Sequence, residues 1–221
     1  MNKKQLTEQE IRTRYITPAI RAAGWQPHQI REEVTFTAGR IIVRGTLSMR
    51  SQQRKRVDYL LTYKPNIPLA IVEAKDNNHT LSAGMDQALE YAELLANAKA
   101  LDVPFVYVSN GDGFMEHDRT LAGGLIEREL QLDEFPGPEA LRQRLNNRKG
   151  LTPDAVEVVN EDYYLDRSGR EPRYYQLVAI NRTVEAIARR QRRILLVMAT
   201  GTGKTYTAFH IIWRLWKART V

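Results

Sequence analysis

Three charged residues stand inside two apolar, strand-like segments of this sequence. Asp58 lies in VDYLLT (57–62), and Glu73 and Lys75 lie at the end of PLAIVEAK (68–75). Charge in segments of this kind is costly to bury unless it is paired or holds a metal ion. The pattern therefore indicates a site whose charges perform chemistry.

The segment between the two runs, KPNI (64–67), has the composition of a tight turn with Pro65 and Asn66 at its centre. A hairpin centred between these two residues places Asp58 directly opposite Glu73, because strand residues pair at equal distances from the turn. Directly opposed residues share one face, with Cβ atoms about 4.5–5.5 Å apart. Two carboxylates that close repel each other unless a cation lies between them.

Lys75 points to the same face as Glu73, since it follows two residues later along the strand. Two opposed carboxylates beside an ammonium group suit a hard divalent cation such as Mg²⁺. We expect Asp58, Glu73 and the backbone carbonyl of Ala74 to bind it jointly. Such an ion lowers the pKa of a bound water and stabilises charge on a phosphate. Lys75 would orient that water or meet the developing charge.

Basic residues lie directly before this charged strand pair. Between positions 40 and 56 they are Arg40, Arg44, Arg50, Arg54, Lys55 and Arg56, with no acidic residue among them. The chain has 221 residues and a formal net charge of +7, and basic proteins often meet nucleic acid. A structural Glu–Lys pair or a solvated surface would explain either feature alone. Together they favour a nuclease, with Arg50, Arg54, Lys55 and Arg56 on DNA phosphates.

The strand pair resembles the PD-(D/E)xK nuclease motif, in the form VD followed by VEAK. The resemblance assigns the catalytic places to Asp58, Glu73 and Lys75. Val57 stands where the name of the motif has proline, a departure that leaves the ligands in place.

Gln87 and Tyr91 match the QxxxY motif that accompanies this site in nucleases similar to the RecB type and in type I restriction enzymes. They are four residues apart and therefore share a helix face, and the resemblance implies that they face the site or the DNA. Some nucleases of this group also use a glutamate on the first helix, for which Glu10 is the candidate. Glu10 has capping-box spacing from Thr7, and we expect it to cap the helix.

A second motif, MATGTGKT (198–205), follows the apolar run ILLVM (194–198) and precedes a helical pattern. Glycines there let backbone N–H groups surround phosphates, and a helix N-terminus adds a favourable potential. Lys204 would reach the β- and γ-phosphates and Thr205 would hold Mg²⁺. The nucleotide-binding candidates are Gln176, Thr200, Gly201, Thr202, Gly203, Lys204 and Thr205.

Met198 stands where the generic phosphate-loop pattern has its first glycine. The segment instead resembles motif I of superfamily 2 helicases, and RYYQ (173–176) resembles their adenine-reading element, with Gln176 as base reader. Nuclease, connector and motor start follow in the order of the R subunit of type I restriction enzymes, over nearly the whole chain. That resemblance implies cleavage of double-stranded DNA, Mg²⁺ and ATP as cofactors, ATP-driven translocation, and methylation and specificity subunits as partners.

Hydrophobic periodicity and turn residues predict the elements that position these groups. The expected helices are 6–25, 82–100, 173–193 and 206–220, and the expected strands are 33–37, 40–45, 57–62, 68–74, 104–110 and 194–198. The run from strand 68–74 through a helix to strand 104–110 is a βαβ unit, so those strands should be parallel. Residues 119–172 indicate a connector of low regularity with one short helix.

The fold class expected is α/β. Residues 1–150 should form a PD-(D/E)xK endonuclease domain, a mixed sheet of four or five strands flanked by helices. Residues 151–172 should form a connector, and 173–221 the truncated start of a superfamily 2 helicase-like ATPase with a RecA-like lobe. A motor also needs a Walker B acid and a second lobe, so no ATP hydrolysis is expected from these residues.

The sequence has no cysteine, no apolar run of about 18 residues and no apolar region of a signal peptide. We therefore expect a cytoplasmic protein without disulfides, Cys-ligated zinc or a membrane span. Alternative functions are a RecB-type DNA repair nuclease fragment, a DNA-docking module that has lost cleavage, and a nucleotide-binding module. The three retained charged residues argue against docking alone, and a nucleotide-binding module leaves the first 150 residues unexplained.

Overall fold

The computed structural model describes residues 3–37, 41–44, 47–50, 54–64, 67–99, 102–164 and 172–220. Contacts divide the chain into two compact units, Met1–Leu145 and Asn146–Val221.

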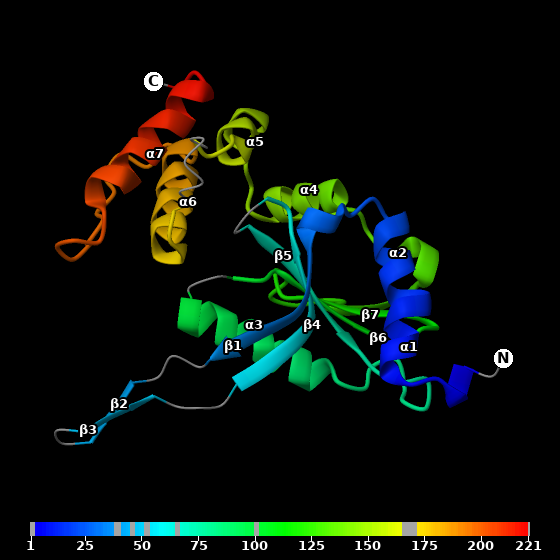
Figure 1. Ribbon diagram of the computed structural model, residues 1–221. Helices are drawn as coiled ribbons and strands as arrows, with labels where there is room; N and C mark the ends of the chain where they lie inside the picture. The colour runs from blue at the N-terminus through cyan, green and yellow to red at the C-terminus, as the bar shows by residue number, and fades with distance from the viewer. Residues whose placement is uncertain are drawn as a thin grey trace. The chain divides into compact units, whose positions relative to one another are not determined.

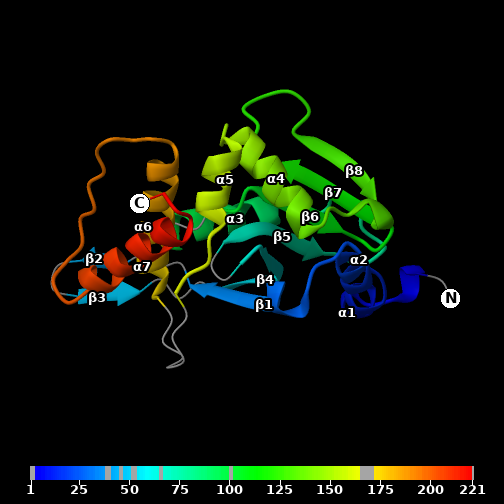
Figure 2. The same cartoon turned by 90° about the horizontal axis from the view of Figure 1, so that it is seen from above.

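A six-stranded sheet organises the first unit, with strand order β1-β4-β5-β6-β7-β8. Figure 2 shows these strands side by side in that order. Their bounds are β1 Ile30–Thr37, β4 Arg54–Thr62, β5 Pro68–Ala74, β6 Phe105–Ser109, β7 Gly113–Asp118 and β8 Glu127–Gln131. Strands β5 and β6 are parallel, as the βαβ prediction requires, and the other neighbours are antiparallel.

The hairpin of β4 and β5 has the predicted register from Tyr59 to Leu61, but a β-bulge follows and Thr62 pairs with Pro68 instead of Leu69. Tyr59 pairs with Val72 and Leu61 with Ala70, and the next pair outward along this ladder is Asp58 with Glu73. Tyr63 N–H donates to the carbonyl of Ile67 at 2.8 Å and closes the turn. The turn centre predicted at Pro65 and Asn66 lies outside the described residues.

Helices cover both faces of the sheet (Figure 1). On one face lies the N-terminal helical segment, made of α1 Glu8–Ile11, the π-helical turn η2 Arg12–Ile16 and α2 Thr17–Ala22. Its Ile11, Ile16 and Ile20 are buried against residues of β4, β5 and β6. On the other face lies α3 Met85–Lys99, buried through a second apolar cluster. The predicted N-terminal helix and the predicted helix 82–100 are thereby confirmed.

The alternation of side chains along β5 decides the face of Glu73. Val72 packs in the cluster beneath the N-terminal helices and Ile71 in the cluster beneath α3, so Glu73 points to the face that α3 covers. Along β4 the alternation is interrupted, because Val57 and Leu60 both pack beneath α3. Alternation therefore does not assign a face to Asp58, which Arg12 contacts from the N-terminal helical segment.

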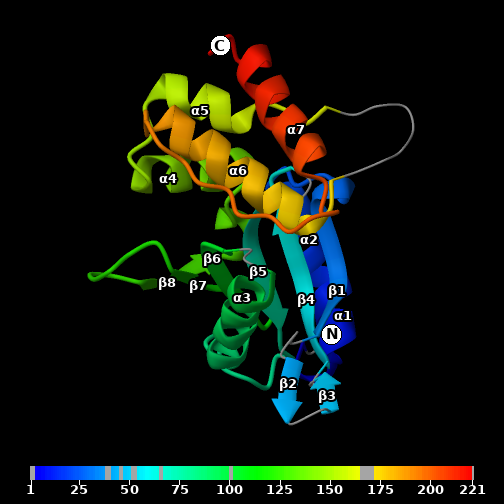
Figure 3. The same cartoon turned by 90° about the vertical axis from the view of Figure 1, so that its left-hand side faces the viewer.

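Short 3₁₀ turns and a small second sheet complete the N-terminal half of this unit. The turns are η1 Lys3–Gln5 and η3 Pro27–Gln29, and the sheet pairs β2 Ile41–Arg44 with β3 Leu47–Arg50. Figure 3 shows β2 and β3 beyond the ends of β1 and β4. Strand β3 was not foreseen from the sequence.

The sheet has more strands than the four or five predicted, and residues 119–172 are more regular than expected. They contain β8, the 3₁₀ turn η4 Leu132–Glu134, α4 Pro138–Arg148 and α5 Pro153–Asn160. Strand β8 was missed because it is an edge strand in which only Leu130 is buried, so its sequence ERELQ carries little apolar signal. Helix α4 is fixed by Arg144, which pairs with buried Glu116 of β7 at 2.8 Å.

The second unit contains α5, α6 Tyr174–Ala188 and α7 Lys204–Lys217. Their apolar contact is made by Val158, Ile180, Val184, Ile211 and Leu215. The helix prediction after the glycine-rich loop is confirmed. Among the described residues, no helix is long and apolar enough to cross a membrane.

The strand predicted at 194–198 is wrong. These residues form no strand, and Leu195 and Val197 are 85% and 87% exposed. A strand satisfies its backbone groups only through neighbouring strands, and no strand within the described residues of this unit lies beside the segment. The apolar pattern alone therefore did not suffice to predict a strand.

Candidate functional site

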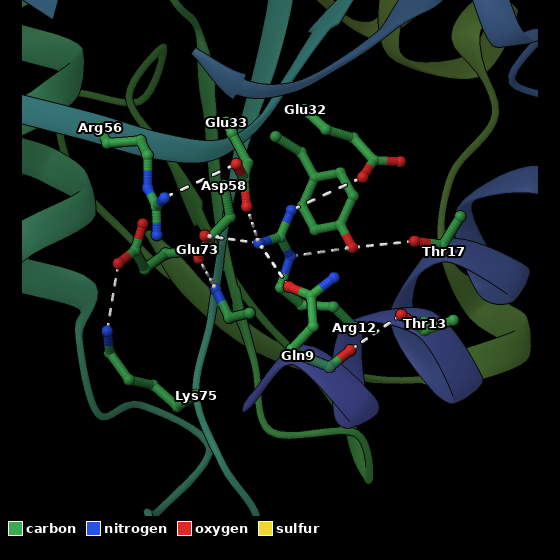
Figure 4. Close-up of polar contacts among 12 residues, drawn as sticks. Gln9, Arg12, Thr13, Thr17, Glu32, Glu33, Arg56, Asp58, Glu73 and Lys75 are labelled. Atoms are coloured by element: carbon green, nitrogen blue, oxygen red, sulfur yellow. Dashed lines mark hydrogen bonds and ion pairs between the residues drawn. The ribbon is translucent and has the colours of Figure 1, made fainter. Parts of the chain in front are cut away.

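Asp58 is held through both carboxylate oxygens. Its Oδ2 accepts a hydrogen bond from the backbone N–H of Ala74 at 2.8 Å, and its Oδ1 lies 3.4 Å from Nη1 of Arg12. The first contact ties the middle of β4 to the last residue of β5, and the second reaches Asp58 from the N-terminal helical segment. Figure 4 shows Asp58 between Arg12 on one side and Glu73 and Lys75 on the other.

Glu73 is the second buried carboxylate, with 4% of its surface exposed. Its Oε1 accepts from Nζ of Lys75 at 3.1 Å, while Oε2 is buried without a hydrogen-bond partner among the described residues. Burial, and after it the negative charge of Asp58, raises the pKa of Glu73 to about 7. The buried carboxylate is therefore costly to ionise without a further cation, and a cation bound beside Oε2 would favour its charged form.

Lys75 joins the strands to α3 through a short chain of hydrogen bonds. Its Nζ donates to Oε1 of Gln87 at 3.3 Å, and Nε2 of Gln87 donates to the hydroxyl of Tyr91 at 2.5 Å. The two residues of the QxxxY pattern therefore lie where the sequence predicts, on one helix face beside the charged strands. In this arrangement Gln87 fixes the position of the Lys75 ammonium group.

Gly84, directly before α3, leaves the room that the Lys75 side chain occupies. Its φ is +95°, and a Cβ added there would lie 2.6 Å from Cε of Lys75. Gly24 has nearly the same φ, +98°, but a Cβ there would meet nothing within 4 Å. The two glycines form a matched pair that separates backbone strain from contact with Lys75.

We expect Gly84→Ala to lower catalysis that depends on Lys75 at least about tenfold, because the lysine is pushed away from Glu73 and Gln87. Gly24→Ala should leave that catalysis unchanged. Both variants should lose similar stability, on the order of 1–2 kcal/mol, from a side chain at positive φ. DNA-cleavage rates and thermal unfolding of both variants test this. Equal rates in the two variants would show that Gly84 does not position Lys75.

Of the two glutamates on the N-terminal helix, Glu8 and not Glu10 is influenced by the charge of Asp58. Glu10 and Thr7 form the predicted capping box, and hydrogen bonds from Thr7 lower the pKa of Glu10. Burial, followed by the charge of Asp58, raises the pKa of Glu8. The signal for Glu8 was its spacing from Ile11, because residues three apart share a helix face and Ile11 is buried.

The ligand set offered by these residues fits Mg²⁺ better than a metal that needs a full protein cage. Within the described ranges, no group of three or more His, Cys, Asp or Glu residues is arranged to hold a metal ion. Mg²⁺ usually takes one or two carboxylates and completes its shell with water and phosphate oxygens. Asp58 and Glu73, with the unpartnered Oε2 of Glu73, meet that requirement.

The basic run is only partly described. Arg54 and Lys55 belong to β4 and Arg50 to β3, but of their side chains nothing is described, and Arg40 lies outside the described residues. Arg56 is exposed, and its Nη1 lies 3.6 Å from Oε2 of Glu33. Of the four proposed DNA-binding residues, Arg56 is therefore the one whose side-chain position is described.

The glycine-rich loop of the second unit closes on itself. Gly201 and Gly203 have φ of +77° and +81°, conformations that glycine adopts at little cost. Nζ of Lys204 donates to the carbonyls of Met198 and Ala199 at 3.3 and 3.2 Å. The ammonium group thus lies against the loop, as a group that binds phosphate from within the loop would.

Gln176 supports this loop from α6. Its Nε2 donates to the carbonyl of Thr202 at 2.9 Å, and its Oε1 accepts from the backbone N–H of Arg173 at 2.8 Å. The structure therefore brings Gln176 to the loop as the motif order predicts. Thr200, Lys204 and Thr205 are exposed, and Lys204 and Thr205 are the first two residues of α7.

Comparison with known proteins finds relatives that match nearly the whole chain, including both candidate sites. The chain is 51% identical to an Escherichia coli protein described as "Type I restriction enzyme EcoAI endonuclease subunit", over 99% of this chain and 26% of that protein. The chain is a homologue of type I restriction enzyme endonuclease subunits. The EcoKI endonuclease subunit of Escherichia coli K12 is 26% identical, over 96% of this chain and 22% of its own length.

A solved structure and a family model agree with this homology. The structure is a fragment described as an HsdR subunit of a type I restriction enzyme from Vibrio vulnificus YJ016. It has a TM-score of 0.72 and 38% identity, and the match covers 97% of this chain and 39% of that one. The model "Type III restriction enzyme, res subunit" matches residues 170–221. The chain spans about a quarter of the length of the curated endonuclease subunits it matches.

Two residues close to Asp58 were not predicted from the sequence. Arg12 contacts Asp58 directly, and Glu33 of β1 contacts Arg12 at 3.1 Å. Arg12 interrupts the apolar face of the N-terminal helix, between Ile11 and Ile16, and this is a detectable signal for a buried charge. Nothing in the local sequence of Glu33 marks it.

Proposed function

We propose that residues 1–150 cleave the phosphodiester backbone of double-stranded DNA with a divalent metal, as the PD-(D/E)xK domain of a type I restriction endonuclease subunit. The observation that carries this proposal is the contact set at the end of the β4–β5 hairpin. Asp58 and Glu73 are both buried, Asp58 accepts from the N–H of Ala74, and Lys75 donates to Glu73 and Gln87.

In the proposed mechanism Asp58, Glu73 and the carbonyl of Ala74 would hold one Mg²⁺. The bound ion would supply an activated water and neutralise charge on the phosphate. Asp58 keeps its orientation through the N–H of Ala74. Lys75, held by Glu73 and Gln87, presents its ammonium group to the water or to the developing charge, where a preorganised donor lowers the barrier.

For the second unit we infer nucleotide binding at the glycine-rich loop. The proposed residues are Gln176, Thr200, Gly201, Thr202, Gly203, Lys204 and Thr205. In a complete subunit this loop would bind ATP and Mg²⁺ for DNA translocation, and methylation and specificity subunits would choose the target, in the cytoplasm. We further propose residues 151–172 as the connector between nuclease and motor, with the motor beginning at residue 173.

Nicking of supercoiled plasmid tests the proposed function. The chain in excess over plasmid should produce open circles with Mg²⁺ and none with EDTA, and Glu73→Gln should be inactive. A closed circle offers no ends, so nicking also separates this function from a repair exonuclease. Plasmid that is bound but stays supercoiled at saturating Mg²⁺ would favour a docking module instead.

The basic run gives a separate prediction for DNA binding. Replacing Arg50, Arg54, Lys55 and Arg56 with Gln should weaken binding equally on unrelated DNA sequences. The slope of log affinity against log salt should flatten by about one unit per lost phosphate contact. Arg21→Gln, at an exposed position on α2, is the control and should change neither quantity. A loss confined to one DNA sequence would contradict phosphate contact.

A further inference from the structure

Glu33 has an unusual backbone conformation beside the candidate site. It lies within β1 between Glu32, which pairs with Tyr59, and Val34, which pairs with Val57. The position between these pairs is opposite Asp58. Its φ is +53°, uncommon for a residue with a side chain. Conformations of this kind persist where surrounding contacts enforce them, and they cluster at functional sites.

The contact that accompanies this conformation is made with Arg12. The Arg12 side chain is only 4% exposed, and one nitrogen, Nη1, lies 3.1 Å from Oε1 of Glu33 and 3.4 Å from Oδ1 of Asp58. Its Nε donates to the hydroxyl of Tyr59 at 3.5 Å. Nη2 lies 3.6 Å from Glu32. Nη1 also donates to Oε1 of Gln9 at 3.2 Å, so Asp58 and Glu33 are its two anionic partners (Figure 4).

The helix that carries Arg12 is irregular at the same place. Arg12 is the first residue of the π-helical turn, and its carbonyl accepts from the N–H of Thr17. Such turns insert a residue into a helix and occur frequently at functional sites. Two irregular backbone segments, one in β1 and one in the helix, thus converge on Asp58.

We propose that Arg12 and Glu33 are positioning residues for Asp58. Arg12 fixes the orientation of the carboxylate that Ala74 holds from the other oxygen. Glu33 balances the charge of Arg12, so that Asp58 keeps its negative charge available to a divalent cation. Without Glu33, Nη1 of Arg12 would keep Asp58 as its one described anionic partner and would compete with the cation. This inference rests on the proposed metal site.

A purely structural role explains the arrangement less well. The Glu33 side chain is 47% exposed and also lies near Arg56, and exposed ion pairs contribute little to stability. A left-handed backbone at a residue with a side chain destabilises the fold. The conformation therefore costs stability and gains a defined charge beside Asp58, as expected of residues that orient a metal ligand.

The experiment measures Mn²⁺ affinity by electron paramagnetic resonance at pH 8, in the whole chain. Glu33→Gln should bind Mn²⁺ at least about tenfold more weakly than the wild type. Glu32→Gln is the matched control, because it removes the same charge from an equally exposed neighbour that contacts a different nitrogen of Arg12. It should bind within about twofold of the wild type. If both variants lost Mn²⁺ affinity equally, the loss would reflect only the removed charge and not the position of Glu33, and the proposal would be overturned.

Two further variants separate positioning from stability. Glu33→Gly should lose Mn²⁺ affinity while its thermal unfolding midpoint stays at or above that of the wild type. Arg12→Lys, which keeps the charge but not the forked donor set, should fold and bind Mn²⁺ more weakly. A lower midpoint with unchanged affinity in Glu33→Gly would show that Glu33 is only structural. Wild-type affinity in Arg12→Lys would likewise overturn the proposal.

Failure of the metal site itself gives a different result. A wild-type chain that binds no Mn²⁺, or an Asp58→Asn variant that binds it unchanged, would refute the proposed function. Wild-type binding that is lost in Asp58→Asn but retained in Glu33→Gln would refute only the positioning role.

Discussion

Glu73→Gln is expected to abolish divalent-metal binding while making the metal-free protein more stable. The side chain keeps its size, but the negative charge that a cation needs is gone. Because Glu73 is buried and its pKa is raised to about 7 from 4.5, removing the charge should stabilise the metal-free fold by about 3 kcal/mol at pH 8. Mn²⁺ titration calorimetry and chemical denaturation at pH 8 measure the two effects.

The pH dependence of stability follows from the same shift. Between about pH 4.5 and 7 folded Glu73 retains a proton that the unfolded chain has released. The free energy of unfolding therefore falls as pH rises through this window. The destabilisation by Glu73 is complete above pH 7 and absent below pH 4.5. Metal binding needs the deprotonated carboxylate, so it should strengthen about tenfold from pH 6 to pH 8 and release a proton at pH 6.

In Glu73→Gln this part of the pH dependence should disappear. Glu129→Gln, on the exposed side of β8, is the control and should alter neither metal binding nor the pH profile. A Glu73→Gln variant that is less stable than the wild type at pH 8, or that retains metal affinity, would contradict the assignment of Glu73.

Lys75→Ala should retain metal binding at pH 8 and lose cleavage by a factor on the order of 10²–10³. The ammonium group is assigned to the water or the phosphate and not to the ion. Lys75 also lowers the pKa of Glu73, so without it metal binding should need a higher pH. Single-turnover cleavage rates and Mn²⁺ affinity across pH 6–9 test both consequences.

Gln87→Ala provides a graded comparison for Lys75. It leaves the lysine charge in place and removes one of its two described acceptors, so the loss of cleavage should be smaller than in Lys75→Ala. Metal affinity should match the wild type. Cleavage by Lys75→Ala at the wild-type rate, or loss of metal in Lys75→Ala at high pH, would remove Lys75 from its proposed role.

Local sequence patterns predicted the parts of this site that depend on periodicity. The register predicted for the β4–β5 hairpin is present from Tyr59 to Leu61, although a bulge near the turn interrupts it, and helical spacing placed Gln87 beside Tyr91. The Thr7–Glu10 capping box was also predicted correctly. Each of these features involves residues within one hairpin or one helix, where spacing determines geometry.

Features that depend on tertiary contacts could not be predicted. The left-handed Glu33 contacts Arg12, which is distant in sequence, and β8 lies at the sheet edge with little apolar signal. At 194–198 the apolar signal is strong but no strand forms, because a strand also needs a neighbouring strand to pair with. Glu8 could be predicted in part. Its spacing from Ile11 indicates the helix face on which it lies, but the sequence does not indicate that this face approaches Asp58.

The most direct test of the metal site is anomalous diffraction from crystals of the chain grown or soaked with Mn²⁺ at pH 8. We expect one strong peak, in coordination contact with the carboxylates of both Asp58 and Glu73, and no such peak in Glu73→Gln crystals. A Mn²⁺ peak that contacts neither carboxylate, or an empty position between them at saturating Mn²⁺, would contradict the proposed metal site.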